Sequence, residues 1–324
     1  MSALISPKRL AVAALVALVL PAAACGTDKS ASGTTSTPSP TATGSGTAAA
    51  PQDCPTAPVD VVVSVDQWGD IVSQLGGKCA RVKTILASSS VDPHDYEPAP
   101  ADAASFAGAK LVVINGADYD HWAADLARTS APSAPVISAA DVTKTPDGAN
   151  PHLWYSPTAV GAVADAVTAE LSKLAPQAAG YFGTERSDFA TALQPYDSLI
   201  DKIKAGASGK SYAATEGIFD YQAQALGLVD KTPEGYQKAS ANESDPSPAD
   251  IEAFRNALAN HQIDVLIYNT QTEGSIPQQI RSAAEQANVP VVDVTETVPP
   301  GVTSFVTWQD DQLTALAKAL GVTV

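Results

Sequence analysis

Eight short runs of β-branched and apolar residues recur along the chain from residue 58 onward, and stretches with helical patterning separate them. Apolar runs of this kind are typical of parallel strands that helices cover on both faces. The sequence therefore predicts an α/β fold with two similar lobes of four strands each. The expected strands are Val59–Val65, Arg81–Leu86, Lys110–Ile114 and Pro135–Ser138, then Ser211–Thr215, Gly227–Asp230, Ile263–Tyr268 and Val289–Val294.

A long helical region lies between the two groups of strands. Ser156-Pro157 is a good helix start, because Ser caps free backbone N–H groups and Pro fits the first turn. That helix is expected to end near Leu174, and a second one to run from about 177 to 205, with a kink at Pro195. About 29 helical residues span roughly 43 Å, so we interpret the second helix as the connector between the lobes. Its apolar stripe consists of Phe182, Phe189, Leu193, Tyr196, Ile200 and Ile203.

The first 24 residues have the features of an export signal. Lys8 and Arg9 precede an apolar run, Leu10 to Leu20, that is too short to span a bilayer, and small residues follow directly before Cys25. This arrangement resembles a bacterial lipobox, in which the Cys is lipidated and becomes the mature N-terminus. Ala22 stands where that pattern has Leu, so an ordinary signal-peptidase cut is the alternative. We expect Cys25 to carry a lipid that anchors the protein to the outer face of the cell membrane.

The residues that follow Cys25 are almost entirely Gly, Ser, Thr, Ala and Pro as far as position 52. Such a composition cannot bury enough apolar surface to fold, so we interpret it as a disordered tether. The expected organisation is a signal peptide at 1–24, a lipidated Cys and tether at 25–57, a first lobe at 58–176, a connecting helix at 177–206 and a second lobe at 207–324.

The two remaining cysteines, Cys54 and Cys79, each stand just before a predicted strand. An even pair outside the cytoplasm suggests a disulfide, which neighbouring parallel strands would bring within reach. Two free thiols in the core are the alternative. The formal net charge of −16 argues against a nucleic-acid partner, because phosphates require Lys and Arg.

Four side chains that can bind a metal follow the carboxyl ends of predicted strands: His94, His152, Glu216 and Glu296. Ligands of open parallel sheets bind outside these ends. Two imidazoles from one lobe and two carboxylates from the other predict a metal site in the cleft between the lobes. Four protein ligands leave little room for the open position that a catalytic metal requires, which favours metal capture over catalysis.

Several motifs resemble the zinc and manganese receptor lipoproteins of ABC importers: VDPHDYEP at 91–98, NGADYDHW at 115–122, NPHLWYSP at 150–157, EGIFDYQAQALGL at 216–228 and NESDPSPADI at 242–251. The resemblance covers about residues 58–324. It implies two (β/α)₄ lobes joined by one rigid long helix. The metal-binding His, His, His-or-Glu and Asp-or-Glu of the family fall on His94, His152, Glu216 and Glu296, with Asp293 as the alternative to Glu296.

The resemblance further implies Zn²⁺ or Mn²⁺ as the transported ligand, and an ABC permease with its ATPase as partners. We expect a monomer. Two departures from the family bear on the metal: the His-rich loop of many zinc receptors is absent, and Glu216 replaces the third His that many of them have. Residue types alone do not choose between the two ions.

Two rival functions share these residues. A metal-dependent hydrolase would need an open metal position and a general base, for which Glu216 or Glu296 is the candidate. A surface adhesin is the second rival, since some members of the family were first described in that way. The two other histidines, His121 and His261, are expected on the surface or beside the ligands rather than as ligands themselves.

Overall fold

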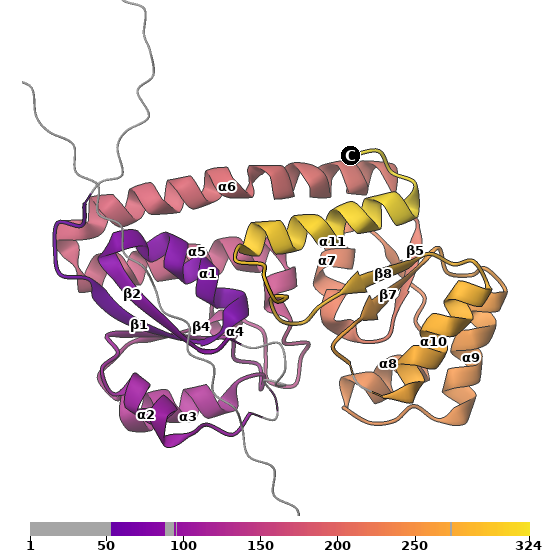
Figure 1. The fold of residues 1–324 in the computed structure, drawn as a ribbon, viewed down its shortest axis with the longest axis horizontal. Coiled ribbons are helices and arrows are strands. Elements are labelled where there is room, and N and C mark those ends of the chain that lie inside the picture. The colour runs from indigo at the N-terminus through magenta and orange to yellow at the C-terminus, as the bar shows by residue number, and fades with distance from the viewer. Residues whose placement is uncertain (1–52, 88–93, 95, 273) are drawn as a thin grey trace, which may run out of the picture. The chain divides into compact units, whose positions relative to one another are not determined.

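The computed structural model describes residues 53–87, 94, 96–272 and 274–324 (Figure 1), and all of them fall within one unit, Ala50–Val324. The predicted signal peptide, Cys25 and most of the tether lie outside the described residues. Among the helices that are described, none combines the length and the apolar character that crossing a membrane requires.

The first lobe is a parallel four-stranded sheet in the order β2-β1-β3-β4. Its central strand β1 is the Val-rich run VDVVVSV, which is buried at nearly every position because helices cover both faces of the sheet. The strands are β1 (Val59–Val65), β2 (Ala80–Leu86), β3 (Leu111–Ile114) and β4 (Val136–Ser138). The helices are α1 (Asp66–Gly76), α2 (Pro100–Phe106), α3 (His121–Ser130), α4 (Ala139–Thr143) and α5 (Pro157–Leu174).

The second lobe repeats this topology with the order β6-β5-β7-β8, again all parallel. The two lobes of four strands that the sequence predicts are confirmed. The strands are β5 (Ser211–Ala214), β6 (Val229–Asp230), β7 (Val265–Asn269) and β8 (Val291–Val294). The helices are α7 (Asp220–Leu226), α8 (Glu234–Ala241), α9 (Pro248–Ala259), α10 (Ser275–Gln286) and α11 (Phe305–Leu320).

Strand β6 is half as long as predicted, and the bounds of the other strands differ from the prediction by at most two residues. We expected Gly227 to open a strand, but it ends α7 in the left-handed conformation, with φ of 72°, and its N–H bonds back into the helix. The next N–H, that of Leu228, bonds to the carbonyl of Ala223. Pairing with β5 therefore begins only at Val229.

The connecting helix is α6 (Ala179–Gly206), which has 28 residues and continues through Pro195. It begins two residues later than predicted because Pro176–Ala178 forms a 3₁₀ turn. All six residues of the predicted apolar stripe are buried. The helix packs against α1 and α5 of the first lobe and against α7 and α11 of the second (Figure 1). Both lobes are therefore packed on the same helix.

A disulfide joins Cys54 and Cys79, whose Cα atoms are 5.1 Å apart. The two cysteines precede β1 and β2, which are neighbours in the sheet with Val59 opposite Ala80. The bond therefore fastens the segment ahead of β1 to the amino-terminal end of the first sheet. The closed loop spans 25 positions, which corresponds to roughly 3.5 kcal/mol of stabilisation in the chain-entropy model.

Candidate metal centre

Three of the four candidate ligands come together where the carboxyl ends of the two sheets meet. One ligand atom each of His94, His152 and Glu296 lies within 4.8 Å of the other two, and the described part of the chain holds no second group of this kind. His152 Nε2 and Glu296 Oε1 are 3.6 Å apart. Two ligands of one tetrahedral Zn²⁺ lie roughly 3.4 Å from each other, so this spacing fits a shared ion.

His152 is oriented by a side chain two residues before it. The Oδ1 atom of Asn150 accepts a hydrogen bond from the backbone N–H of His152 at 3.0 Å and lies 2.7 Å from its Nδ1. The Nδ2 atom of Asn150 donates to the carbonyl of Gly217 at 2.6 Å. This bond independently supports the orientation of the amide in which Oδ1 faces His152. Nδ1 therefore carries the proton, and Nε2 presents its lone pair to the site.

Glu296 is held by its backbone. The Oε1 atom of Gln271 accepts hydrogen bonds from the N–H groups of Glu296 and Thr297, at 2.6 and 2.9 Å. From the first lobe, Gln67 Nε2 donates to the carbonyl of Glu296 at 3.1 Å. These contacts place the carboxylate opposite His152 without engaging Oε1.

The facing atoms of His152 and Glu296 are buried and have no hydrogen-bond partner: Nε2 of the imidazole and Oε1 of the carboxylate. Burial alone would raise the pKa of Glu296, but the adjacent imidazole of His152, with smaller effects of Tyr119 and His94, brings that pKa below its ordinary value. Two such acceptors that face each other at 3.6 Å, beside a second imidazole, form an arrangement that a shared cation would satisfy.

His94 completes the group from the region that follows β2, and its side chain is 24% exposed. Its ring packs edge-on against Tyr119, with the centroids 4.7 Å apart. Its Nδ1 lies 3.6 Å from Oε1 of Glu243, which the second lobe supplies between α8 and α9. The neighbouring residues 88–93 and 95 are outside the described part of the chain.

Tyr119 owes its position to a tight loop after β3. The carboxylate of Asp120 is fully buried and accepts hydrogen bonds from the N–H groups of Asn115 and Gly116, at 2.7 and 2.8 Å, and from Ser64. Burial raises the pKa of Asp120, and these hydrogen bonds oppose the rise. Gly116 has φ of 77°, and a Cβ there would lie 2.4 Å from Ser138 Oγ, so only glycine fits.

Glu216, the fourth candidate, is not part of the group of three. It lies two residues after β5, and its Oε2 accepts hydrogen bonds from Asn269 Nδ2, at 2.8 Å, and from Thr272 Oγ1. The alternative ligand, Asp293, is also outside the group, because its half-exposed carboxylate is ion-paired with Arg281 at 2.6 Å. Between Asp293 and Glu296, the geometry thus favours Glu296.

Several polar residues around the site were not singled out from the sequence: Gln67, Asn150, Asn269, Gln271 and Thr272. Three of them stand at or just after the end of β7, which lies between β5 and β8 in the sheet. The strand-end argument applied to β7 would have pointed to them. His121 and His261 are exposed, as expected.

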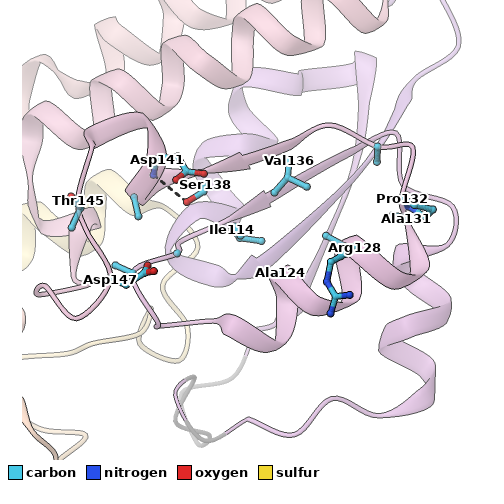
Figure 2. A pocket seen from close by; sticks show the side chains of 15 residues that line it. Ile114, Ala124, Arg128, Ala131, Pro132, Val136, Ser138, Asp141, Thr145 and Asp147 are labelled. Atoms are coloured by element: carbon cyan, nitrogen blue, oxygen red, sulfur yellow. Dashed lines mark hydrogen bonds between the residues drawn. The ribbon is translucent and has the colours of Figure 1, made fainter.

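A cavity of about 550 Å³ lies elsewhere in the first lobe (Figure 2). Side chains from the β3–β4 edge and α3 line it, among them Arg128, Val136 and Asp147, and the cap of α4 is visible at its wall, where Ser138 accepts from Asp141 N–H at 3.2 Å. None of the four candidate ligands lines it. It is therefore separate from the metal centre.

Residues 61–319 match the model of a protein family described as zinc-uptake complex component A, periplasmic. The chain belongs to this family. It is 22% identical over 217 residues to the high-affinity zinc uptake system protein ZnuA of Bacillus subtilis, a match that covers 61% of this chain and 67% of that one. It is 26% identical over 242 residues to the manganese-binding lipoprotein MntA of the same organism, covering 71% and 77%.

Solved structures agree on the fold. The SBP FpvC of Pseudomonas aeruginosa, solved in complex with Mn²⁺, matches with a TM-score of 0.68 and 21% identity, over 82% of this chain and 98% of that chain. The periplasmic zinc-binding protein TroA of Treponema pallidum also matches with a TM-score of 0.68, at 18% identity, over 82% and 99%. At these identities the likeness establishes the shared two-lobed architecture.

Proposed function

We propose that this protein is an extracytoplasmic substrate-binding protein that captures Zn²⁺ or Mn²⁺ and delivers it to an ABC importer. The observation that carries the proposal is the pair of buried, unpartnered atoms, His152 Nε2 and Glu296 Oε1, that face each other at 3.6 Å with His94 beside them. Family membership and the relatives named for zinc and manganese uptake point to the same kind of cargo.

The proposed ligands are His94, His152 and Glu296 in the arrangement described, with Glu216 as a fourth. An imidazole pair with carboxylates suits divalent transition ions, and the absence of thiolates in this set avoids oxidation outside the cytoplasm. For Glu216 to join, its carboxylate has to move toward the group of three against the two hydrogen bonds that Asn269 and Thr272 make to its Oε2. Affinity is expected to fall on acidification, because an imidazole binds metal only in its neutral form.

We propose that the site binds rather than catalyses, that the protein acts as a monomer with a permease and its ATPase, and that lipidated Cys25 anchors it to the membrane. The domain boundaries predicted from the sequence are part of this proposal. Because α6 packs on both lobes, metal loading is expected to rearrange loops at the site rather than open a wide hinge.

Calorimetric titration of the chelator-treated protein with Zn²⁺ and with Mn²⁺ tests the central claim. Capture from dilute surroundings requires a Kd below about 1 μM, which corresponds to roughly −8 kcal/mol. His121→Ala is the matched control, since His121 is exposed and outside the site. Failure of both ions to bind in this range would remove the proposed function. Hydrolysis of a phosphoester or peptide that required His152 would favour the enzyme rival instead.

Lipidation has its own test. Cells grown with a labelled fatty acid are expected to label the wild-type protein and to leave the Cys25→Ser variant unlabelled. If the wild-type protein carried no label, the signal peptide would be removed without attachment of a lipid.

A further inference from the structure

The segment that ends β7 contacts both carboxylate-bearing segments of the second lobe. Strand β7 lies between β5, which precedes Glu216, and β8, which precedes Glu296. Gln271 binds the backbone N–H groups of Glu296 and Thr297 through its side chain. Asn269 and Thr272 bind the carboxylate of Glu216. One short segment therefore fixes one carboxylate in the site and holds the other by its oxygen.

Asn269, the first donor to Glu216, is itself well anchored. Asn269 is 2% exposed, its N–H donates to Thr215 Oγ1 at 3.2 Å, and its Oδ1 accepts from the N–H of Gln271 at 3.0 Å. Its Nδ2 is thereby aimed at Glu216. The hydroxyl of Thr272 donates to the same oxygen, Oε2. Both hydrogen bonds are charge-assisted, and such bonds are stronger than neutral ones.

We propose that Thr272, with Asn269, holds the Glu216 carboxylate back from the metal-free site and so makes Thr272 a determinant of metal choice. This inference rests on the proposed function, because it concerns how the captured ion recruits its last ligand. An ion that is satisfied by His94, His152 and Glu296 plus a solvent molecule leaves Glu216 on its two donors. An ion that needs more oxygen ligands has to draw Glu216 toward the group of three against these two hydrogen bonds, both of which are made to Oε2.

The two candidate ions differ in this respect. Zn²⁺ is commonly four-coordinate and accepts three protein ligands with a water molecule, whereas Mn²⁺ favours more oxygen ligands, carboxylates among them. Withdrawal of Glu216 therefore weakens Mn²⁺ binding more than Zn²⁺ binding. Thr272 sets part of that difference.

Thr272→Val removes the hydroxyl while it keeps the shape of the side chain. We expect the variant to bind Mn²⁺ about tenfold more tightly than the wild type and Zn²⁺ no more than about threefold more tightly. Thr270→Val is the matched control from the same segment: the Thr270 hydroxyl donates to the carbonyl of Val294 at 3.3 Å and has no bond to Glu216. That control is expected to leave both affinities unchanged.

A double-mutant cycle shows whether Thr272 acts through Glu216. In a Glu216→Gln background the gain from Thr272→Val is expected to disappear. Thermal melting of the metal-free variants by circular dichroism confirms that each is folded before its affinity is compared.

The outcomes separate this inference from the proposed function. A wild type that binds neither ion overturns both. A wild type that binds, combined with a Thr272→Val variant whose Mn²⁺ affinity is unchanged or lower, overturns the inference alone. The inference is likewise overturned if the gain persists when Glu216 is Gln, or if Zn²⁺ gains as much as Mn²⁺.

Discussion

Glu296 and Glu216 follow strands of the same sheet, yet their surroundings hold them in opposite ways. The backbone of Glu296 is pinned by Gln271 and Gln67, and its carboxylate keeps a buried oxygen without a partner. The carboxylate of Glu216 already has two donors. The first is a ligand prepared in advance, which reduces the cost of ordering it when the ion binds. The second is hydrogen-bonded through Oε2 and lies outside the group of three.

The largest effect is expected from the prepared pair. His152→Ala leaves the buried Glu296 carboxylate without its facing group, and we expect metal affinity to fall at least about 100-fold. Calorimetric titration of His152→Ala checks this, with His121→Ala as the control because His121 is exposed and outside the group of three. A loss of less than about tenfold would mean that the pair is not the centre of the site.

Removing the orienting amide is expected to have the next largest effect. Asn150→Ala frees the His152 ring to adopt the other tautomer, and affinity is expected to drop about 10- to 100-fold. Nitrogen-15 NMR of the imidazole in the metal-free protein reports the tautomer directly. An unchanged tautomer together with an unchanged Kd would show that other contacts orient the ring.

The recruited ligand is expected to matter less. Glu216→Gln removes a charge that is bound to Asn269 and Thr272 rather than prepared for the ion, so we expect a loss of about tenfold or less for Zn²⁺. Glu296→Gln, measured in the same titration, should lose clearly more. A larger loss of affinity for Glu216→Gln than for Glu296→Gln would contradict the distinction between the two carboxylates.

The first lobe also has a carboxylate at a strand end, that of Asp66, which directly follows β1. Burial raises the pKa of Asp66 to about 6 from an ordinary 3.8. The folded state therefore binds more protons than the unfolded state between these values, and the stability contributed by this group is lost as the pH rises from about 4 to 6.

Asp66→Asn removes that loss. We expect the variant to gain on the order of 2 kcal/mol of unfolding free energy at about pH 7.5 and little below about pH 4, with metal affinity changed less than about twofold. Urea unfolding at the two pH values measures the stability. A uniform shift at both would assign the effect to packing rather than to the proton.

The smallest effect on binding is expected from the disulfide. Replacing both Cys54 and Cys79 with Ser is expected to lower the free energy of unfolding by roughly 3.5 kcal/mol and to leave the Kd for metal unchanged. Denaturant unfolding and titration of the same preparation give both values. A weakened Kd would link the bond to the site, contrary to their separation in the sheet.

Much of the fold was predictable because it depends on local patterns. Valine-rich runs such as Val59–Val65 fit only buried strands, and the stripe from Phe182 to Ile203 fits one face of a helix. The length of β6 was not predictable from its apolar residues, because Gly227 serves as a helix cap, and a glycine is compatible with either role.

The site was predictable only as far as strand ends locate side chains. That rule brought out His94, His152 and Glu296, which the structure gathers. The hydrogen bonds to Glu216 could not be predicted, because Asn269 and Thr272 lie more than fifty positions away and reach it only through the β5–β7 pairing. Hydrogen bonds between distant side chains follow from topology rather than from local pattern.

The disulfide stands at the amino-terminal end of β1, whereas the proposed ligands follow the carboxyl ends of the strands. The seven residues of β1, at about 3.3 Å each, put roughly 23 Å of strand between the two. A pull applied to the chain ahead of Cys54 is thus shared by two hydrogen-bonded strands before it reaches the ligands. A force on that segment would therefore act at one end of the sheet, and the proposed metal ligands stand at the other.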